Sequence, residues 1–130
     1  MPAPSTATFM RLADLIAIPD ATTRQTRPVI EAFTGKQLAT VPVATTQDAK
    51  DAITRARVAQ KSWADRPVAE RSAIFHRYRD LVLQNRGDLM DMAQAETGKS
   101  RAAAQNEVLD IALTARQYAR VTPSCCGQSA

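Results

Sequence analysis

The feature that most constrains the fold is the spacing of apolar residues after Thr45. From that point apolar side chains recur at intervals of three and four, the period that gathers side chains on one face of an α-helix. Thr45 followed by Asp48 resembles a capping box, and Pro67 suits the first position of a second helix. We therefore expect amphipathic helices to make up most of this chain.

Two glycines and a serine divide the rest of the helical part. Gly87 predicts a break or kink, and Gly98 predicts a helix end in the left-handed conformation. Ser100 can cap a last helix, whereas the residues after Arg120 show no period and are expected to form an unpatterned tail, residues 121–130. The residues expected on the apolar faces are Ala49, Ala52, Ile53, Ala56 and Trp63, then Ile74, Phe75, Tyr78, Leu81 and Val82, and finally Ala104, Val108, Ile111, Ala112, Ala115 and Tyr118.

The part before Thr45 differs in character. A short helix is expected between Ser5 and Pro19, followed by a polar linker. Two short strands then flank Thr34-Gly35-Lys36, which predicts a hairpin with the glycine at its turn. Pro28 and Pro42 suit only edge or terminal strand positions, so the ribbon is expected at the periphery. The predicted fold class is mostly α with a small N-terminal β-hairpin.

The stretch AQAETGKS, residues 93–100, fits a loose phosphate-loop pattern. A phosphate loop must follow a buried strand and open a helix, so that backbone N–H groups converge on the anion. The residues before Ala93 instead show helical spacing and carry Asp88 and Asp91. We therefore interpret Glu96-Thr97-Gly98-Lys99 as a helix terminus with a surface lysine.

Composition and charge narrow the class of protein. The net charge of +4 and the pI of about 9.5 permit an anionic partner, but the basic residues are scattered among acids, which disfavours nucleic-acid binding. No stretch approaches the roughly 20 apolar residues that span a bilayer, and no secretory signal is recognised. With only the adjacent Cys125 and Cys126, neither a disulfide framework nor a zinc site is expected, and we predict a cytoplasmic protein.

The residue types that carry chemistry give no catalytic pattern. The one histidine, His76, lies in a predicted helix with no serine or cysteine placed to pair with it. No glycine-rich dinucleotide loop is present. We assign no catalytic, cofactor-binding or metal-binding residue to this chain.

The segment FTGKQLATVPVATTQDAKDAITRARVAQKSWADRPVAERSAIFHRYRDLVLQNRGDLMDMAQAETGKS, residues 33–100, resembles the opening part of the aldehyde dehydrogenase superfamily. The order of the shared features is more specific than any one of them. They are the Thr34-Gly35-Lys36 turn with its following Val-Pro step, the pattern from Ala52 and Ala56 to Gln60 and Trp63, then Arg71, Glu96-Thr97-Gly98-Lys99, and Glu107-Val108. RPVAERSAIFHRYRDLVLQNR and EVLDIALTARQYAR are most similar to bacterial succinate-semialdehyde dehydrogenases.

The resemblance implies an oxidoreductase that converts aldehydes to carboxylic acids with NAD or NADP. In that chemistry a cysteine thiolate attacks the aldehyde, hydride passes to the nicotinamide, and a glutamate activates water. The matching segment is, in the family, the outer shell of an α/β, Rossmann-like cofactor-binding domain. Residues 1–120 would then be the N-terminal part of that domain.

The chain departs from the family in what it lacks. Family members are several times longer, and the likeness is expected to end after Arg120, before the oxyanion asparagine, the cofactor-binding lysine, the general base and the nucleophile. No role carries over to Cys125 or Cys126. We hypothesise a frameshift or premature stop, and a fragment that binds no cofactor and is inactive alone.

Two further hypotheses belong to other classes of protein. One is a small helical protein-interaction module, and the other, weakly supported by the scattered charges, is a basic nucleic-acid binder. The expected partners are a second copy of the chain or a full-length relative, with no nucleic acid and no membrane.

Overall fold

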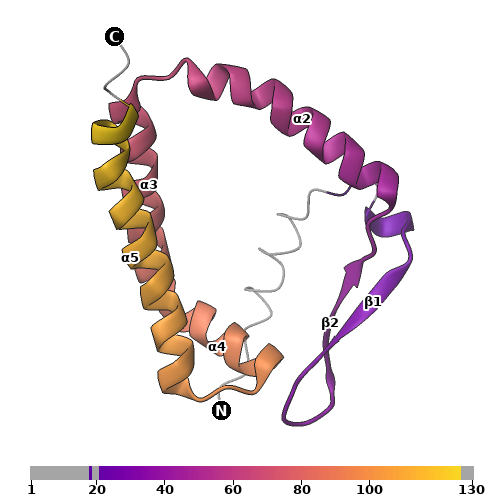
Figure 1. Ribbon diagram of the computed structural model, residues 1–130. Helices are drawn as coiled ribbons and strands as arrows, with labels where there is room; N and C mark the ends of the chain where they lie inside the picture. Colours follow the sequence, from indigo (N-terminus) through magenta and orange to yellow (C-terminus); the bar gives the residue numbers. More distant parts are fainter. Residues whose placement is uncertain (1–17, 19–20, 127–130) are drawn as a thin grey trace.

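The computed structural model describes residue 18 and residues 21–126, which form a two-stranded ribbon and four long helices (Figure 1). The elements are a 3-10 turn η1 (Ala21–Thr23), strands β1 (Thr26–Ile30) and β2 (Gln37–Pro42), and helices α2 (Thr46–Ala64), α3 (Val68–Gln84), α4 (Arg86–Thr97) and α5 (Arg101–Cys126). The predicted fold class, mostly helical with one small hairpin, is confirmed. The helix expected between Ser5 and Pro19 lies almost entirely outside the described residues.

Strands β1 and β2 pair antiparallel, with Thr26 opposite Pro42 and Pro28 opposite Thr40. Since the N–H of Val43 donates to the carbonyl of Gln25 at 2.8 Å, the alternation of an antiparallel ladder puts Pro28 and Pro42 at positions whose nitrogens face away from the other strand. Neither proline therefore removes a ladder bond. The ribbon tolerates both prolines because each of its strands is an edge strand, as predicted.

The turn of the hairpin uses the predicted glycine. Gly35 has a φ of 68°, and its N–H donates to the carbonyl of Glu31 at 3.0 Å. The N–H of Glu31 in turn donates to the carbonyl of Lys36 at 2.8 Å, which closes the loop. Glycine pays little steric penalty for a positive φ, so the turn forms without strain.

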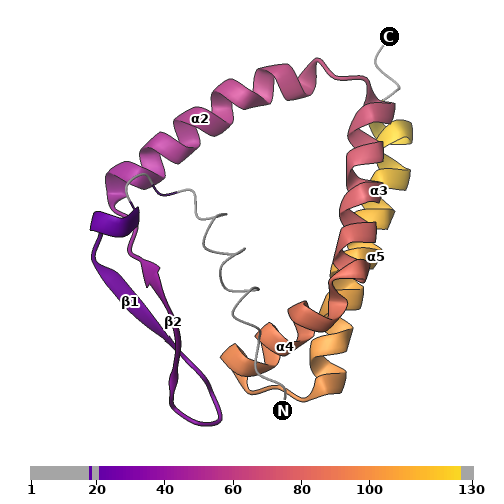
Figure 2. The ribbon, with the colours of Figure 1, turned by 180° about the vertical axis from the view of Figure 1, so that it is seen from behind.

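Helices α3 and α5 run antiparallel and lie side by side, with α4 joining them at one end (Figures 1 and 2). The hydrophobic cluster between them consists of Val82, Val108 and Ala112, with Leu83 and Met90 packed against it. Small side chains at Ala104, Ala115 and Ala119 are also buried along α5. This alanine stripe lets the two helix backbones approach closely.

Helix α2 crosses from the α3–α5 pair to the hairpin on the other side of the molecule (Figure 1). None of its side chains is buried, although the sequence predicts an apolar face there. Its start is as predicted: Thr45 is the N-cap, and both hydrogen bonds of the capping box with Asp48 are present.

Three predicted features are wrong in detail. Pro67 is the N-cap of α3 rather than its first helical residue. Ile111 and Tyr118, expected on the same apolar side of the last helix as the buried Ala104, are 41% and 63% exposed. Helix α5 continues through residues 121–126, where an unpatterned tail is expected, because a helix already formed extends at little cost even without an apolar period of its own.

Candidate interaction surface

Among residues 18 and 21–126, no three His, Cys, Asp or Glu residues are grouped so that they could hold a metal ion. His76 is partly buried within α3, and Cys125 and Cys126 are the last two residues of α5.

Glu96-Thr97-Gly98-Lys99 is a helix terminus, as predicted. Helix α4 ends at Thr97, and Gly98 follows with a φ of 73° and an N–H that donates to the carbonyl of Gln94 at 2.9 Å. The Lys99 side chain forms an ion pair with Glu107 of α5. A helix rather than a strand precedes this glycine, so the segment lacks the geometry of a phosphate loop.

The same terminus anchors the hairpin. The N–H of Ala32, in the hairpin loop, donates to the carbonyl of Ala95 in α4 at 2.9 Å. Gly98 lies so close to this loop that a Cβ added to it would be 3.2 Å from the Cβ of Ala32. Gly98 thus has two roles. It ends helix α4, and its lack of a Cβ lets the hairpin loop pack against the end of that helix.

Polar side chains fix the junction between α4 and α5. Arg101, at the start of α5, forms an ion pair with Asp91 and donates to Oε1 of Gln94 at 3.0 Å. Gln94 is only 4% exposed, and its Nε2 donates to the carbonyl of Lys99 at 3.4 Å. Ser100 caps α5 as predicted, since its Oγ accepts from the N–H of Ala103 at 3.2 Å.

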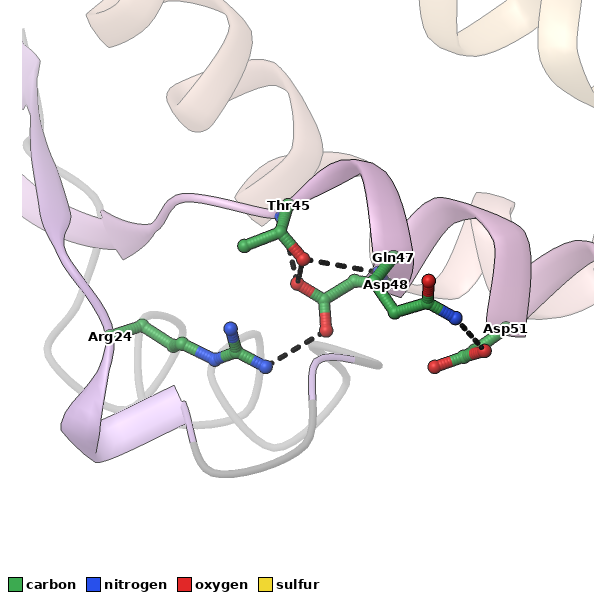
Figure 3. A network of polar contacts seen from close by, with 5 residues as sticks. All are labelled: Arg24, Thr45, Gln47, Asp48 and Asp51. Atoms are coloured by element: carbon green, nitrogen blue, oxygen red, sulfur yellow. Dashed lines mark hydrogen bonds and ion pairs between the residues drawn. The ribbon is translucent and has the colours of Figure 1, made fainter.

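A second polar network joins the hairpin to α2 (Figure 3). Nη2 of Arg24, just before β1, lies 2.9 Å from Oδ1 of Asp48, while Oδ2 of the same carboxylate accepts from the N–H of Thr45 at 2.7 Å and from its Oγ1 at 2.6 Å. The side-chain and backbone hydrogen bonds from Thr45, helped by the charge of Arg24, lower the pKa of Asp48 below its ordinary value. This network is a structural clamp at the start of α2.

The largest unexplained feature is an apolar surface shared by α3 and α5, here called the α3–α5 apolar face. Its members are 40–63% exposed: Ile74, Phe75, Tyr78 and Leu81 from α3, and Ile111 and Tyr118 from α5. A shallow groove of about 370 Å³ runs along it, lined by Phe75, Tyr78, Asp110, Ile111, Thr114, Ala115 and Tyr118. Among these lining residues Asp110 alone carries a charge.

The opposite side of the helix pair is more polar. A groove of about 300 Å³ there is lined by Leu83, Leu109, Ala112 and Leu113 together with the charged Arg79, Asp80 and Arg116. Nη2 of Arg79 pairs with Oδ1 of Asp80 at 2.6 Å. The two sides therefore differ in charge, although Leu109 and Leu113 on this second side are also 40% and 58% exposed.

The sequence analysis placed the members of this face on the apolar sides of two helices, but it did not say whether a neighbour covers them. A signal was present in α5, where Ala104, Val108, Ala112, Ala115 and Ala119 form an unbroken stripe of small residues at helical spacing. Such a stripe can pack closely against one helix and leave its larger neighbours, Ile111 and Tyr118, at the flank.

Comparison with known proteins identifies one protein family over nearly the whole chain. The description "Aldehyde dehydrogenase family" matches residues 18–130. The match extends to the last residue, so the expectation that the likeness ends after Arg120 is wrong. None of the helices among the described residues combines the length and the hydrophobicity that a membrane span requires.

Two mycobacterial relatives carry the provisional name succinate-semialdehyde dehydrogenase [NADP(+)]. The protein from Mycolicibacterium smegmatis is 59% identical over 120 residues, which cover 92% of this chain and 23% of the relative. That from Mycobacterium tuberculosis H37Rv is 54% identical over 121 residues, covering 93% and 23%. The chain thus spans about a quarter of the length of these relatives.

Solved structures with the same fold are also aldehyde dehydrogenases. An NAD-dependent benzaldehyde dehydrogenase from Corynebacterium glutamicum matches with a TM-score of 0.74 and 25% identity, over 78% of this chain and 22% of that one. A 3,6-anhydro-L-galactose dehydrogenase in complex with NAP matches with a TM-score of 0.74 and 27% identity, over 78% and 21%. The chain therefore belongs to the aldehyde dehydrogenase family.

Proposed function

We propose that this chain is the N-terminal shell of the cofactor-binding domain of an NADP-linked succinate-semialdehyde dehydrogenase, and that it catalyses no reaction alone. The observation that carries the proposal is the 59% identity to a relative of that provisional name, sustained over 92% of the chain. The confirmed hairpin, the glycine helix stop and the exposed α3–α5 apolar face all suit an outer layer that covers other parts of a domain.

The inactivity proposed for the isolated chain is supported by its polar groups, because those that could hold the phosphates of NADP are already paired with other residues. Phosphates bind well at helix N-termini and to basic side chains. In the described part of the chain, however, the start of α2 is occupied by the Asp48 carboxylate, and the basic residues at the start of α5, Lys99 and Arg101, pair with Glu107 and Asp91. These residues do not fit a cradle for the phosphates of NADP.

A turnover assay on the purified chain tests this proposal. Succinate semialdehyde and NADP⁺ are mixed with the chain, and reduced nicotinamide is followed by its absorbance, with the Mycolicibacterium smegmatis relative as a positive control. We expect no rate above that of the buffer from this chain. Saturable NADPH formation that disappears in a Cys125→Ser/Cys126→Ser variant would contradict the proposed inactivity.

A second candidate function, a small helical protein-interaction module, is favoured by one observation. The α3–α5 apolar face offers aromatic side chains at Phe75, Tyr78 and Tyr118, a residue type common in protein interfaces. A monodisperse monomer that melts cooperatively would support this module over the shell of a larger domain, because a shell exposes apolar surface and self-associates.

A further inference from the structure

We propose that Pro28 and Pro42 keep the hairpin two-stranded, because each removes an N–H donor from an outer edge of the ribbon to which a strand of a second copy would otherwise pair. Edges of a sheet carry backbone groups that are not bonded within it, and sheets of different molecules join there. The register of the hairpin fixes which nitrogens face outward. The missing donors therefore do not depend on how much of a longer protein surrounds the ribbon, nor on the reaction that the relatives catalyse.

The outer edge of β1 is interrupted at its middle. Every second residue of an antiparallel strand turns its backbone N–H and C=O away from the partner strand. In β1 these outward positions are Thr26, Pro28 and Ile30. Ile30 is one of them because the next residue, Glu31, donates inward, to the carbonyl of Lys36. Pro28 is exposed and has no N–H, so a strand that approached β1 would find no donor at the central outward position.

The outer edge of β2 (Gln37–Pro42) is interrupted in two places. The pairing with β1 skips Leu38, which is therefore an extra residue in β2 and forms a bulge. A bulge breaks the regular spacing of donors along a strand and increases its twist. At the other end of the strand, Pro42 faces outward without an N–H. Between these two interruptions Thr40 faces outward and keeps its N–H, which is too short a run of donors for a further strand.

The rest of the ribbon would otherwise favour pairing between molecules. Ile30 and Val41 are β-branched, which suits a strand, and they are 45% and 37% exposed. Exposed segments of this kind that contain no proline are the ones that pair into extended sheets. A proline at a position that makes no hydrogen bond in the ladder interrupts such a segment without weakening the hairpin itself. Both prolines of the ribbon occupy positions of that type.

Pro28 should have a larger effect than Pro42. An N–H restored at position 28 would complete a run of outward donors with those of Thr26 and Ile30. An N–H restored at position 42 would add only to that of Thr40, because the bulge ends the run on the other side. The two substitutions to threonine therefore make the same chemical change at edges of different length.

Thioflavin T fluorescence of the full chain, with a reductant present, tests the proposal, since the dye responds to β-sheets that extend between molecules and not to contacts between helices. We expect Pro28→Thr to speed the appearance of the signal at least about fivefold relative to the wild type, because one hydrogen bond of ordinary net strength is gained at each added strand. Pro42→Thr should have a smaller effect. Pro67→Thr removes a proline at the N-cap of α3, outside the ribbon, and should leave the signal unchanged.

Circular dichroism and urea unfolding serve as controls for folding. Both should be nearly the same for Pro28→Thr and the wild type, because no hydrogen bond within the ladder is altered. If Pro28→Thr loses helical circular dichroism, Pro28→Ala takes its place, since it restores the same N–H with a smaller side chain. Equal rates for the position-28 variant and the wild type, or an equal acceleration by Pro67→Thr, would overturn the proposal.

Discussion

Substitution of Gly98 by alanine tests the joint between α4 and the hairpin. Two costs combine at this position. Alanine at a φ of 73° is strained, since left-handed backbone costs an L-residue about 1–2 kcal/mol. Its Cβ would also lie 3.2 Å from the Cβ of Ala32 and 3.8 Å from the ring of Phe33.

The crowding is not easily relieved, because the N–H of Ala32 is held at 2.9 Å from the carbonyl of Ala95. Moving the loop away would stretch this hydrogen bond, which leads to a further cost of about 1 kcal/mol. Alanine also lowers the conformational entropy of the unfolded chain, which offsets about 0.4–1 kcal/mol of the lost stability. We expect Gly98→Ala to lower the free energy of unfolding by about 2 kcal/mol.

Two other glycines supply matched controls. Gly35 has a φ of 68° but nothing within 4 Å of an added Cβ, so Gly35→Ala carries the strain without the crowding and should cost about 1 kcal/mol. Gly87 lies in α4 with open space around it and no positive φ, so Gly87→Ala should stabilise by about 0.5 kcal/mol.

The assay is urea unfolding followed by circular dichroism for the wild type and the three variants, all at one protein concentration so that self-association affects them alike. The expected order of stability is Gly87→Ala, wild type, Gly35→Ala, Gly98→Ala. If Gly98→Ala were no less stable than Gly35→Ala, the contact between the hairpin loop and α4 would not contribute, and the reasoning would be refuted.

Three further predictions concern α2 and the cofactor. Thr45→Ala removes the N-cap and should cost about 1 kcal/mol in urea unfolding, whereas Thr54→Ala, in the exposed middle of α2, should cost nothing measurable; equal losses would contradict the capping role. Because the folded pKa of Asp48 lies below the ordinary 3.8, its stabilising contribution is complete above that pH and is lost as the pH falls through the folded pKa. Asp48→Asn should flatten that part of the curve of stability against pH, and an unchanged curve would count against the clamp. Added NADP⁺ should leave the Tm of the chain unchanged, and a rise that saturates with NADP⁺ would show a cofactor site that the paired Lys99 and Arg101 argue against.

Local signals in the sequence correctly predicted the start of α2, the end of α4 and the start of α5. Thr45, Gly98 and Ser100 begin or end helices through hydrogen bonds to residues no more than four positions away, so these capping roles do not depend on the rest of the fold. The hairpin turn at Gly35 is equally local. The phosphate-loop interpretation could be rejected for the same reason, since the residues before Ala93 already indicated a helix.

Burial could not be predicted in the same way, because it depends on which elements meet. The sequence marks Ile111 and Tyr118 as apolar but does not say whether a neighbour covers them, and in the described structure both remain exposed. The same holds for the apolar residues of α2, none of which is buried. The absence of a catalytic site also stays a prediction, which the turnover assay addresses.

The kind of core that α3 and α5 share explains why the α3–α5 apolar face matters for folding. Contacts made through Ala104, Ala112, Ala115 and Ala119 bring the backbones together but remove little apolar area, since each alanine side chain is a single methyl group. The large apolar side chains lie at the flank, where Phe75 and Tyr78 are still 40% and 48% exposed, so part of their stabilisation is gained only when something covers them. The helix pair therefore buries only a small hydrophobic core, and its main effect is to hold the large apolar side chains on one surface. Whichever partner covers that surface, a second copy or the remainder of a longer dehydrogenase, its affinity should set the folded fraction of this chain.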